Sequence, residues 1–89
     1  MNYQTILKHL KKLYLAKGIT RCELRFDGCW GNNGLSWAHR HKRIFYKSQP
    51  ELLEDFNQTI LACVYCHQKI EYDRKLTEEK FIKLRGEEI

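Results

Sequence analysis

Apolar residues recur at helical spacing near the beginning of the chain. Within residues 3–17 they stand at Ile6, Leu7, Leu10, Leu13 and Tyr14, and this three-to-four-residue period predicts an amphipathic helix. Asn2 is placed to cap its first turn and Gly18 to end it, as a helix N-cap and C′ residue would. His9 lies beside the apolar stripe and is therefore expected on the surface.

Turn residues and short apolar segments alternate through the rest of the chain. Residues 20–34 are rich in Gly and Asn and are expected to be irregular. We expect short strands at 35–39 and 59–62, a short helix opened by a Ser48–Glu51 capping box, a helix over 64–74, and a last helix over 77–85 with Thr77 as N-cap and Gly86 at its end. These elements predict a small α+β fold.

Length and composition limit what such a fold can be. The chain has 89 residues, 43% hydrophobic and 30% charged, which is typical of one small globular domain spanning 1–89. Domains of this size bury a modest core and often add a metal or disulfides. No apolar stretch approaches the roughly 18 residues of a membrane span, and the N-terminus does not resemble a signal peptide. We therefore expect a cytoplasmic chain with no membrane association and no large organic cofactor.

Charge is distributed unevenly along the chain. Residues 1–48 hold ten Lys or Arg and two acidic residues, a net charge of +8, whereas residues 49–89 have a net charge of −3. Such asymmetry indicates that the first half of the chain binds a polyanion. Basic residues Arg40, Lys42 and Arg43 stand next to Phe45 and Tyr46, a combination that suits nucleic acid, although a solvated basic loop beside core aromatics would read the same.

Four cysteines require an explanation in a chain this short. Cys22 and Cys29 form one local pair, and Cys63 and Cys66 form a second, C-x2-C pair. Two disulfides would need an oxidising compartment, for which the sequence gives no sign, whereas four thiolates on two segments are a common structural zinc site. The run Cys63–His67 also fits the pattern for covalent haem attachment, but haem would leave the first pair unexplained.

Polar residues that could perform chemistry lie beside these cysteines. His39 and His41 close the first expected strand, Asn57 precedes the second, and His67 directly follows the last cysteine. If the cysteines bind zinc by themselves, His67 is free to hold a second metal, and a strand histidine could deprotonate water. The alternative is that one histidine completes a three-cysteine zinc site and the others lie on the surface.

The ordered set of cysteine pair, His39, Asn57 and Cys63-x-x-Cys66-His67 resembles small HNH endonucleases of the phage and prophage type. The resemblance covers residues 22 to about 72, and its core of about 20–75 would be flanked by the N- and C-terminal helices. It implies a ββα-metal fold with a four-cysteine structural zinc. It also implies metal-assisted hydrolysis of DNA, with His39 as general base, Asn57 orienting it and His67 binding a catalytic divalent ion (Mg, Mn, Ni or Zn).

Position 38 departs from the family pattern. Many members have a second metal ligand immediately before the base, where this chain has Ala38. Either another group binds the ion, or His39 is the ligand and His41 the base. Glu71 is available because it lies four residues after His67, on the same helix face.

The resemblance also bears on partners. Arg40, Lys42 and Arg43 fall where the family meets the DNA backbone, and phosphate contacts position a protein without reading sequence, so weak sequence preference is expected. A homodimer or a phage protein partner is possible, and a phage-encoded chain would act in the host cytoplasm. Two alternatives stay open: a catalytically inactive, zinc-stapled nucleic-acid-binding module, and a structural protein that binds another protein.

Overall fold

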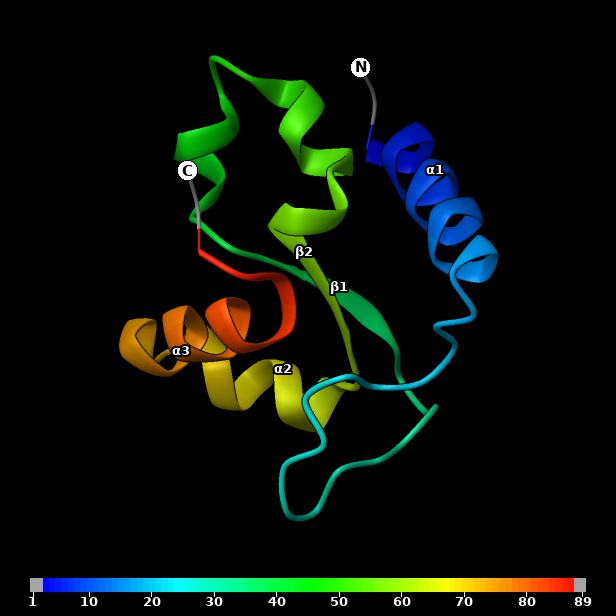
Figure 1. Cartoon of the computed structure of the whole chain (residues 1–89), viewed down its shortest axis with the longest axis vertical. Helices are drawn as coiled ribbons and strands as arrows, with labels where there is room; N and C mark the ends of the chain where they lie inside the picture. The colour runs from blue at the N-terminus through cyan, green and yellow to red at the C-terminus, as the bar shows by residue number, and fades with distance from the viewer. Residues whose placement is uncertain (1–2, 88–89) are drawn as a thin grey trace.

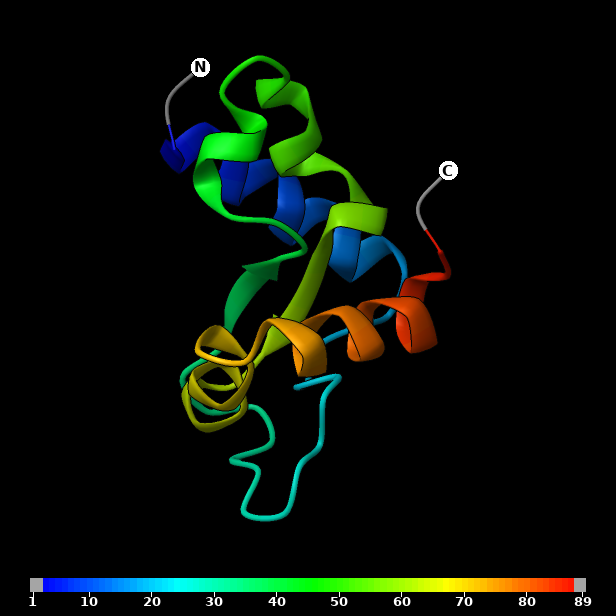
Figure 2. The same cartoon turned by 90° about the vertical axis from the view of Figure 1, so that its left-hand side faces the viewer.

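A two-stranded sheet lies between helices on its two faces (Figures 1 and 2). The computed structural model describes residues 3–87. Within them the elements are α1 (Tyr3–Ala16), β1 (Ser36–His39), β2 (Thr59–Ala62), α2 (Val64–Glu71) and α3 (Arg74–Arg85), with three short 3-10 turns, η1 (Arg43–Tyr46), η2 (Pro50–Glu54) and η3 (Phe56–Gln58), between the strands. The predicted small α+β fold is confirmed at this level.

The strands pair antiparallel, with Ser36 opposite Ala62 and His39 opposite Thr59. Because side chains alternate along a strand, β1 supplies two separate cores. Ala38 packs with Cys66, Ile70 and Phe81 on the side of α2 and α3, whereas Trp37 packs on the other side with α1, against residues such as Leu10 and Tyr14. Neighbouring residues of β1 therefore serve opposite faces of the sheet.

The end of α1 follows from its sequence. The backbone N–H of Gly18 donates to Leu15 and that of Ile19 donates to Tyr14, which is the Schellman arrangement at a helix C-terminus. Gly18 has φ +74°, a conformation that glycine adopts without steric cost. The predicted Asn2 cap lies outside the described residues.

The boundary between α2 and α3 differs from the prediction. Helix α2 ends at Glu71 instead of residue 74, and α3 begins at Arg74 instead of residue 77. The N-cap is Asp73, whose carboxylate accepts from the backbone N–H of Leu76 at 3.0 Å; Asp and Thr are both good caps, and the earlier one forms here. Thr77 is buried instead, with its hydroxyl 2.6 Å from the carbonyl oxygen of Ile70.

The predicted capping box at Ser48 does not form. The residue preceding η2 is Gln49, whose side chain makes no capping hydrogen bond, and Pro50 occupies the first turn. Proline favours the first helical position because its φ is already fixed and its missing N–H is not needed there. The turn consequently starts one residue later than a Ser48 cap would place it.

None of the helices within residues 3–87 combines the length and apolar character that a membrane span requires.

Candidate functional site

The four cysteine sulfurs meet at one point beneath the sheet. The Sγ atoms of Cys22, Cys29, Cys63 and Cys66 all lie within 4.8 Å of one another, and those of Cys29 and Cys63 are 3.8 Å apart. A tetrahedral ion with metal–sulfur bonds of about 2.3 Å has sulfur–sulfur edges of about 3.8 Å. The donor set and its spacing therefore fit a zinc-type metal, and these residues could hold one.

Backbone N–H groups surround the sulfur of Cys63. Those of Trp30 and Cys66 each donate to it at 3.4 Å. Burial acts to raise the pKa of Cys63, but these two N–H donors, together with hydrogen bonds from the side chains of Cys66 and Cys29, outweigh it and lower that pKa to about 6. A thiolate is the form that binds a metal. The loop and the start of α2 therefore favour the metal-binding form of Cys63. Burial raises the pKa of Cys66, whose deprotonation is then the step a metal would drive.

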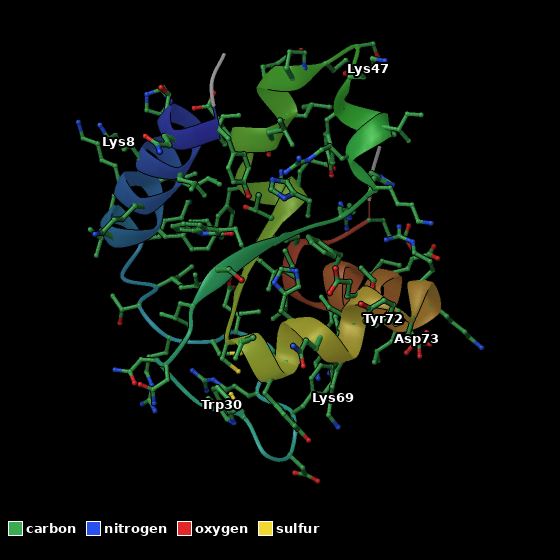
Figure 3. The ribbon with its side chains drawn as sticks, turned by 180° about the vertical axis from the view of Figure 1, so that it is seen from behind. Lys8, Trp30, Lys47, Lys69, Tyr72 and Asp73 are labelled. Carbon is green, nitrogen blue, oxygen red and sulfur yellow. The ribbon has the colours of Figure 1, made fainter. Side chains whose placement is uncertain are left out.

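Local sequence brings the two cysteine pairs together. Cys63 caps α2, so its side chain turns back over the first helical turn. The irregular loop is fastened to β2 by the backbone of Glu23, whose N–H donates to Leu61 at 2.8 Å. Gly28 has φ +88°, and a Cβ there would come within 2.9 Å of the Tyr65 ring, so only glycine lets the loop pass so close to α2. Figure 3 shows Trp30 beside the sulfur atoms.

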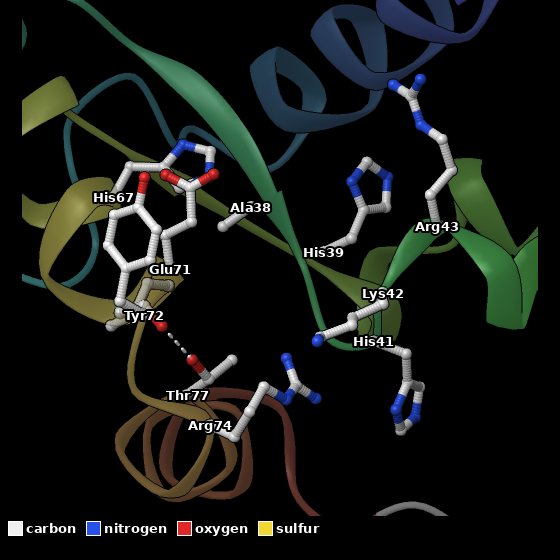
Figure 4. Close-up of a pocket in the computed structure, with 11 residues that line it drawn as sticks. Ala38, His39, His41, Lys42, Arg43, His67, Glu71, Tyr72, Arg74 and Thr77 are labelled. Carbon is white, nitrogen blue, oxygen red and sulfur yellow. Dashed lines mark hydrogen bonds between the residues drawn. The ribbon is translucent and has the colours of Figure 1, made fainter.

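A second candidate site lies where the end of β1 meets the corner between α2 and α3 (Figure 4). It is a pocket of about 430 Å³. His39 and His67 both line it, together with Glu71 from α2. Its rim carries the cationic side chains of Lys42, Arg43 and Arg74. The pocket thus combines an imidazole pair, a carboxylate and positive charge, which is a chemistry suited to a phosphate group.

The ring of His67 is fixed by the sheet. Its Nδ1 lies 2.9 Å from the hydroxyl oxygen of Ser36, and this contact leaves Nε2 as the nitrogen for another ligand. Glu71 stands one helical turn later and is exposed, so both side chains lie on the same face of α2. A histidine whose second nitrogen is held by a hydrogen bond is the usual form of a metal ligand. His67 and Glu71 could therefore hold a divalent ion.

His39 is held from the other face of the sheet. Its Nε2 lies 3.1 Å from the carbonyl oxygen of Leu53, which only a protonated nitrogen can approach in this way, so Nδ1 is left as the basic nitrogen. The ring also packs edge-on against Tyr46, with centroids 5.5 Å apart. Burial lowers the pKa of His39; the Leu53 hydrogen bond opposes this shift, and the charge of Arg43 adds to it. The lowered pKa favours the neutral imidazole, which is the form that can accept a proton.

Two of the predicted site residues do not join the pocket. Asn57 is exposed within η3 and is absent from the pocket lining; the group that orients His39 is the Leu53 carbonyl instead. Arg40 is only 7% exposed, and its guanidinium donates to the carbonyl oxygens of Asn57 and Gly86. The Arg40 guanidinium is thus engaged within the protein, whereas Lys42 and Arg43 are exposed; DNA contact by Arg40 stays a prediction that this placement does not favour.

His41, the alternative candidate for the general base, also lines the pocket. Its backbone N–H donates to the hydroxyl of Tyr46 at 3.0 Å, and its ring packs on Phe45.

The sequence did not single out Ser36 and the Leu53 carbonyl, which contact the pocket histidines, or Arg74, which lines the pocket. Ser36 had a readable signal, because it lies two residues before Ala38 and alternation places both on the face that meets α2. Arg74 donates to the carbonyl oxygen of Arg40 at 2.9 Å, and the position of a backbone carbonyl such as that of Leu53 has no signature in sequence.

Comparison of the chain with protein-family models, with curated proteins and with solved structures finds no match.

Proposed function

We propose that the protein is a metal-dependent endonuclease of HNH type, which hydrolyses DNA phosphodiester bonds. One observation carries the proposal: a neutral histidine from β1 and a histidine–carboxylate pair from α2 line the same pocket under a cationic rim. The order strand, long connection, strand and helix agrees with the ββα arrangement that the sequence resemblance implies. The cysteine cluster beside it supports the same resemblance.

In this mechanism His39 is the general base. Its Nδ1 takes a proton from the attacking water, while the Leu53 carbonyl holds Nε2–H and supports the imidazolium that forms. His67 and Glu71 would hold a divalent ion, which supplies charge stabilisation at the phosphate and the leaving oxygen. Ser36 keeps the His67 ring in the tautomer that presents Nε2.

The rim of the pocket positions the substrate. Lys42 and Arg43 are exposed beside His39, and cations placed there neutralise backbone phosphates on either side of the scissile bond. Contacts of this kind fix the register of the protein on DNA without reading bases. The enzyme should therefore cleave with weak sequence preference, and a zinc ion at the four cysteines would serve structure only.

Relaxation of supercoiled plasmid tests the proposal. The wild type is compared with His39→Ala and with His41→Ala, in Mg, Mn, Ni or Zn and in EDTA. We expect ion-dependent relaxation that falls at least ~100-fold in His39→Ala, the contribution of a general base, and changes little in His41→Ala. His9→Ala is the matched control, since His9 is an exposed histidine on α1. Circular dichroism establishes that each variant is folded.

A second function is favoured by a specific feature of the pocket. Ala38 contributes no ligand, and within residues 3–87 the cysteines form the one cluster of three or more metal-binding side chains. An ion at His67 and Glu71 would thus depend on water and substrate for its other ligands. The alternative is a zinc-stapled module that binds nucleic acid without cleaving it. Plasmid bound at low salt, with no relaxation in any ion, would select this alternative.

A further inference from the structure

The turn that follows the pocket presents apolar side chains to solvent. Ile44 is 79% exposed and Phe45 is 42% exposed, both in η1. Single exposed apolar residues are ordinary on protein surfaces. Here two stand next to each other in the green connection between β1 and β2 (Figure 1), directly after Lys42 and Arg43, which line the pocket.

This turn has a rigid base. Tyr46 is buried, and its hydroxyl accepts from the backbone N–H of His41 at 3.0 Å and donates to Gln58 at 2.9 Å. The Phe45 ring packs edge-on against Tyr46 and lies over the His41 ring, with centroids 5.1 and 4.0 Å apart. The apolar tip formed by Ile44 and Phe45 is therefore held in one place before any partner binds, which reduces the entropy lost on binding.

The surroundings of the tip indicate the partner. Lys42, Arg43 and Lys47 are exposed around it, and Figure 3 shows Lys47 at the bend that follows η1. No acidic residue occurs between residues 28 and 50. Lysine is depleted in protein–protein interfaces, whereas a cationic surface with an apolar tip matches a polyanion with stacked apolar faces, namely duplex nucleic acid.

We propose that Ile44 and Phe45 form a wedge that enters a base step of duplex DNA next to the phosphate held in the pocket. Lys42 and Arg43 bind the phosphates beside the opened step, and Ile44, as the most exposed side chain, leads into the stack. Insertion of apolar side chains between base pairs unstacks the step and bends the duplex, which brings more backbone against the protein. The inference rests on the proposed function in one respect, that the substrate is DNA.

Salt-dependent binding separates the wedge from the phosphate contacts. Full-length His39→Ala protein, in which cleavage is expected to be at least ~100-fold slower, is titrated with a 20-base-pair duplex at several salt concentrations. Adding Ile44→Ser should weaken binding about ten-fold at every salt concentration, because it removes apolar burial but no counterion release. Adding Lys47→Gln should instead reduce the slope of log K against log salt by about 0.9. Leu15→Ser, at an exposed leucine on α1, should change neither.

Base unstacking gives an independent readout. A duplex containing 2-aminopurine should brighten when the protein binds and should brighten far less with Ile44→Ser. Unchanged affinity in Ile44→Ser, or no binding of DNA by the wild type at low salt, overturns the wedge; the latter would leave a protein as the partner of the apolar tip. Both readouts use binding alone, so failure of the wild type to cleave refutes the nuclease and leaves the wedge result standing.

Discussion

Arg85 at the end of α3 holds the cysteine loop, the sheet and α1 together. Its side chain is 3% exposed, and its guanidinium donates to the carboxylate of Glu23 at 2.7 Å, to the carbonyl of Phe56 at 2.9 Å and to the hydroxyl of Tyr14 at 3.1 Å. Burial alone would lower the pKa of Arg85, but the contacts with Glu23 and Tyr14 raise it above its usual value. The guanidinium is therefore charged, buried and fully engaged.

Arg85→Met removes the charge and keeps much of the apolar stem. Loss of one partner of a buried ion pair costs about 3–5 kcal/mol because the other charge stays behind. Glu23 keeps one donor, the backbone N–H of Leu61 at 2.9 Å, so we expect a loss near the lower end, about 3 kcal/mol. A domain of this length has a free energy of unfolding of only about 4–13 kcal/mol. The variant should therefore unfold about 12–24 °C below the wild type.

Urea and thermal unfolding of the metal-loaded protein measure this loss. Lys83→Met on the exposed side of α3 is the matched control and should change the free energy by less than about 0.5 kcal/mol. Glu23→Gln should cost less than Arg85→Met, and the double variant less than the sum, because the two side chains interact directly. A loss below about 1 kcal/mol in Arg85→Met, or strict additivity, would refute the view that this ion pair joins the layers.

Three further outcomes follow from the site. Chelation of the metal, or Cys63→Ala, should lower the unfolding midpoint by about 10 °C or more, since four-thiolate binding energy is folding energy; one equivalent of zinc lost per chain is the check. Because the pKa of His39 is lowered, cleavage at saturating metal should fall on acidification with a midpoint below 6.5, and a midpoint above 6.5 would contradict its role as base. Ser36→Ala should lower the affinity of the His67–Glu71 site for a divalent ion 10–100-fold, as measured by calorimetry, whereas Ser48→Ala, at an exposed serine, should leave this affinity unchanged.

Local signals in the sequence predicted helix ends well where the required backbone conformation suits essentially one residue type. Gly18 ends α1 and Gly86 ends α3, both at positive φ, because few other residues adopt that conformation cheaply. The α2–α3 corner was predicted three residues late, since Asp73 and Thr77 are both acceptable caps and tertiary packing chose between them. The buried Thr77 hydroxyl is satisfied by the carbonyl of Ile70, a contact that no local pattern encodes.

Charge was the less reliable guide at the site. Arg40 belongs to a basic run in sequence, yet it is buried and lies 5.3 Å from the centre of the Phe81 ring. Alternation explains the difference: Ala38 and Arg40 both point inward, so the pattern of β1 continues one residue beyond the strand. Lys42 and Arg43 follow the point where the chain leaves the sheet, and their exposure depends on that bend, which the sequence does not specify.

The position of the pocket follows from the alternation of β1 itself. Ser36 and Ala38 face α2, where Ser36 holds His67, whereas His39 faces the opposite side, where Leu53 holds it. His39 and His67, on opposite faces of the sheet, can approach one ligand only around the end of the strand, and that is where the pocket opens. The small side chain of Ala38 lies between them in the lining (Figure 4). Under the proposed function, a larger apolar residue at position 38 would occupy the space that the phosphate needs, so cleavage requires either a small residue or a metal ligand there.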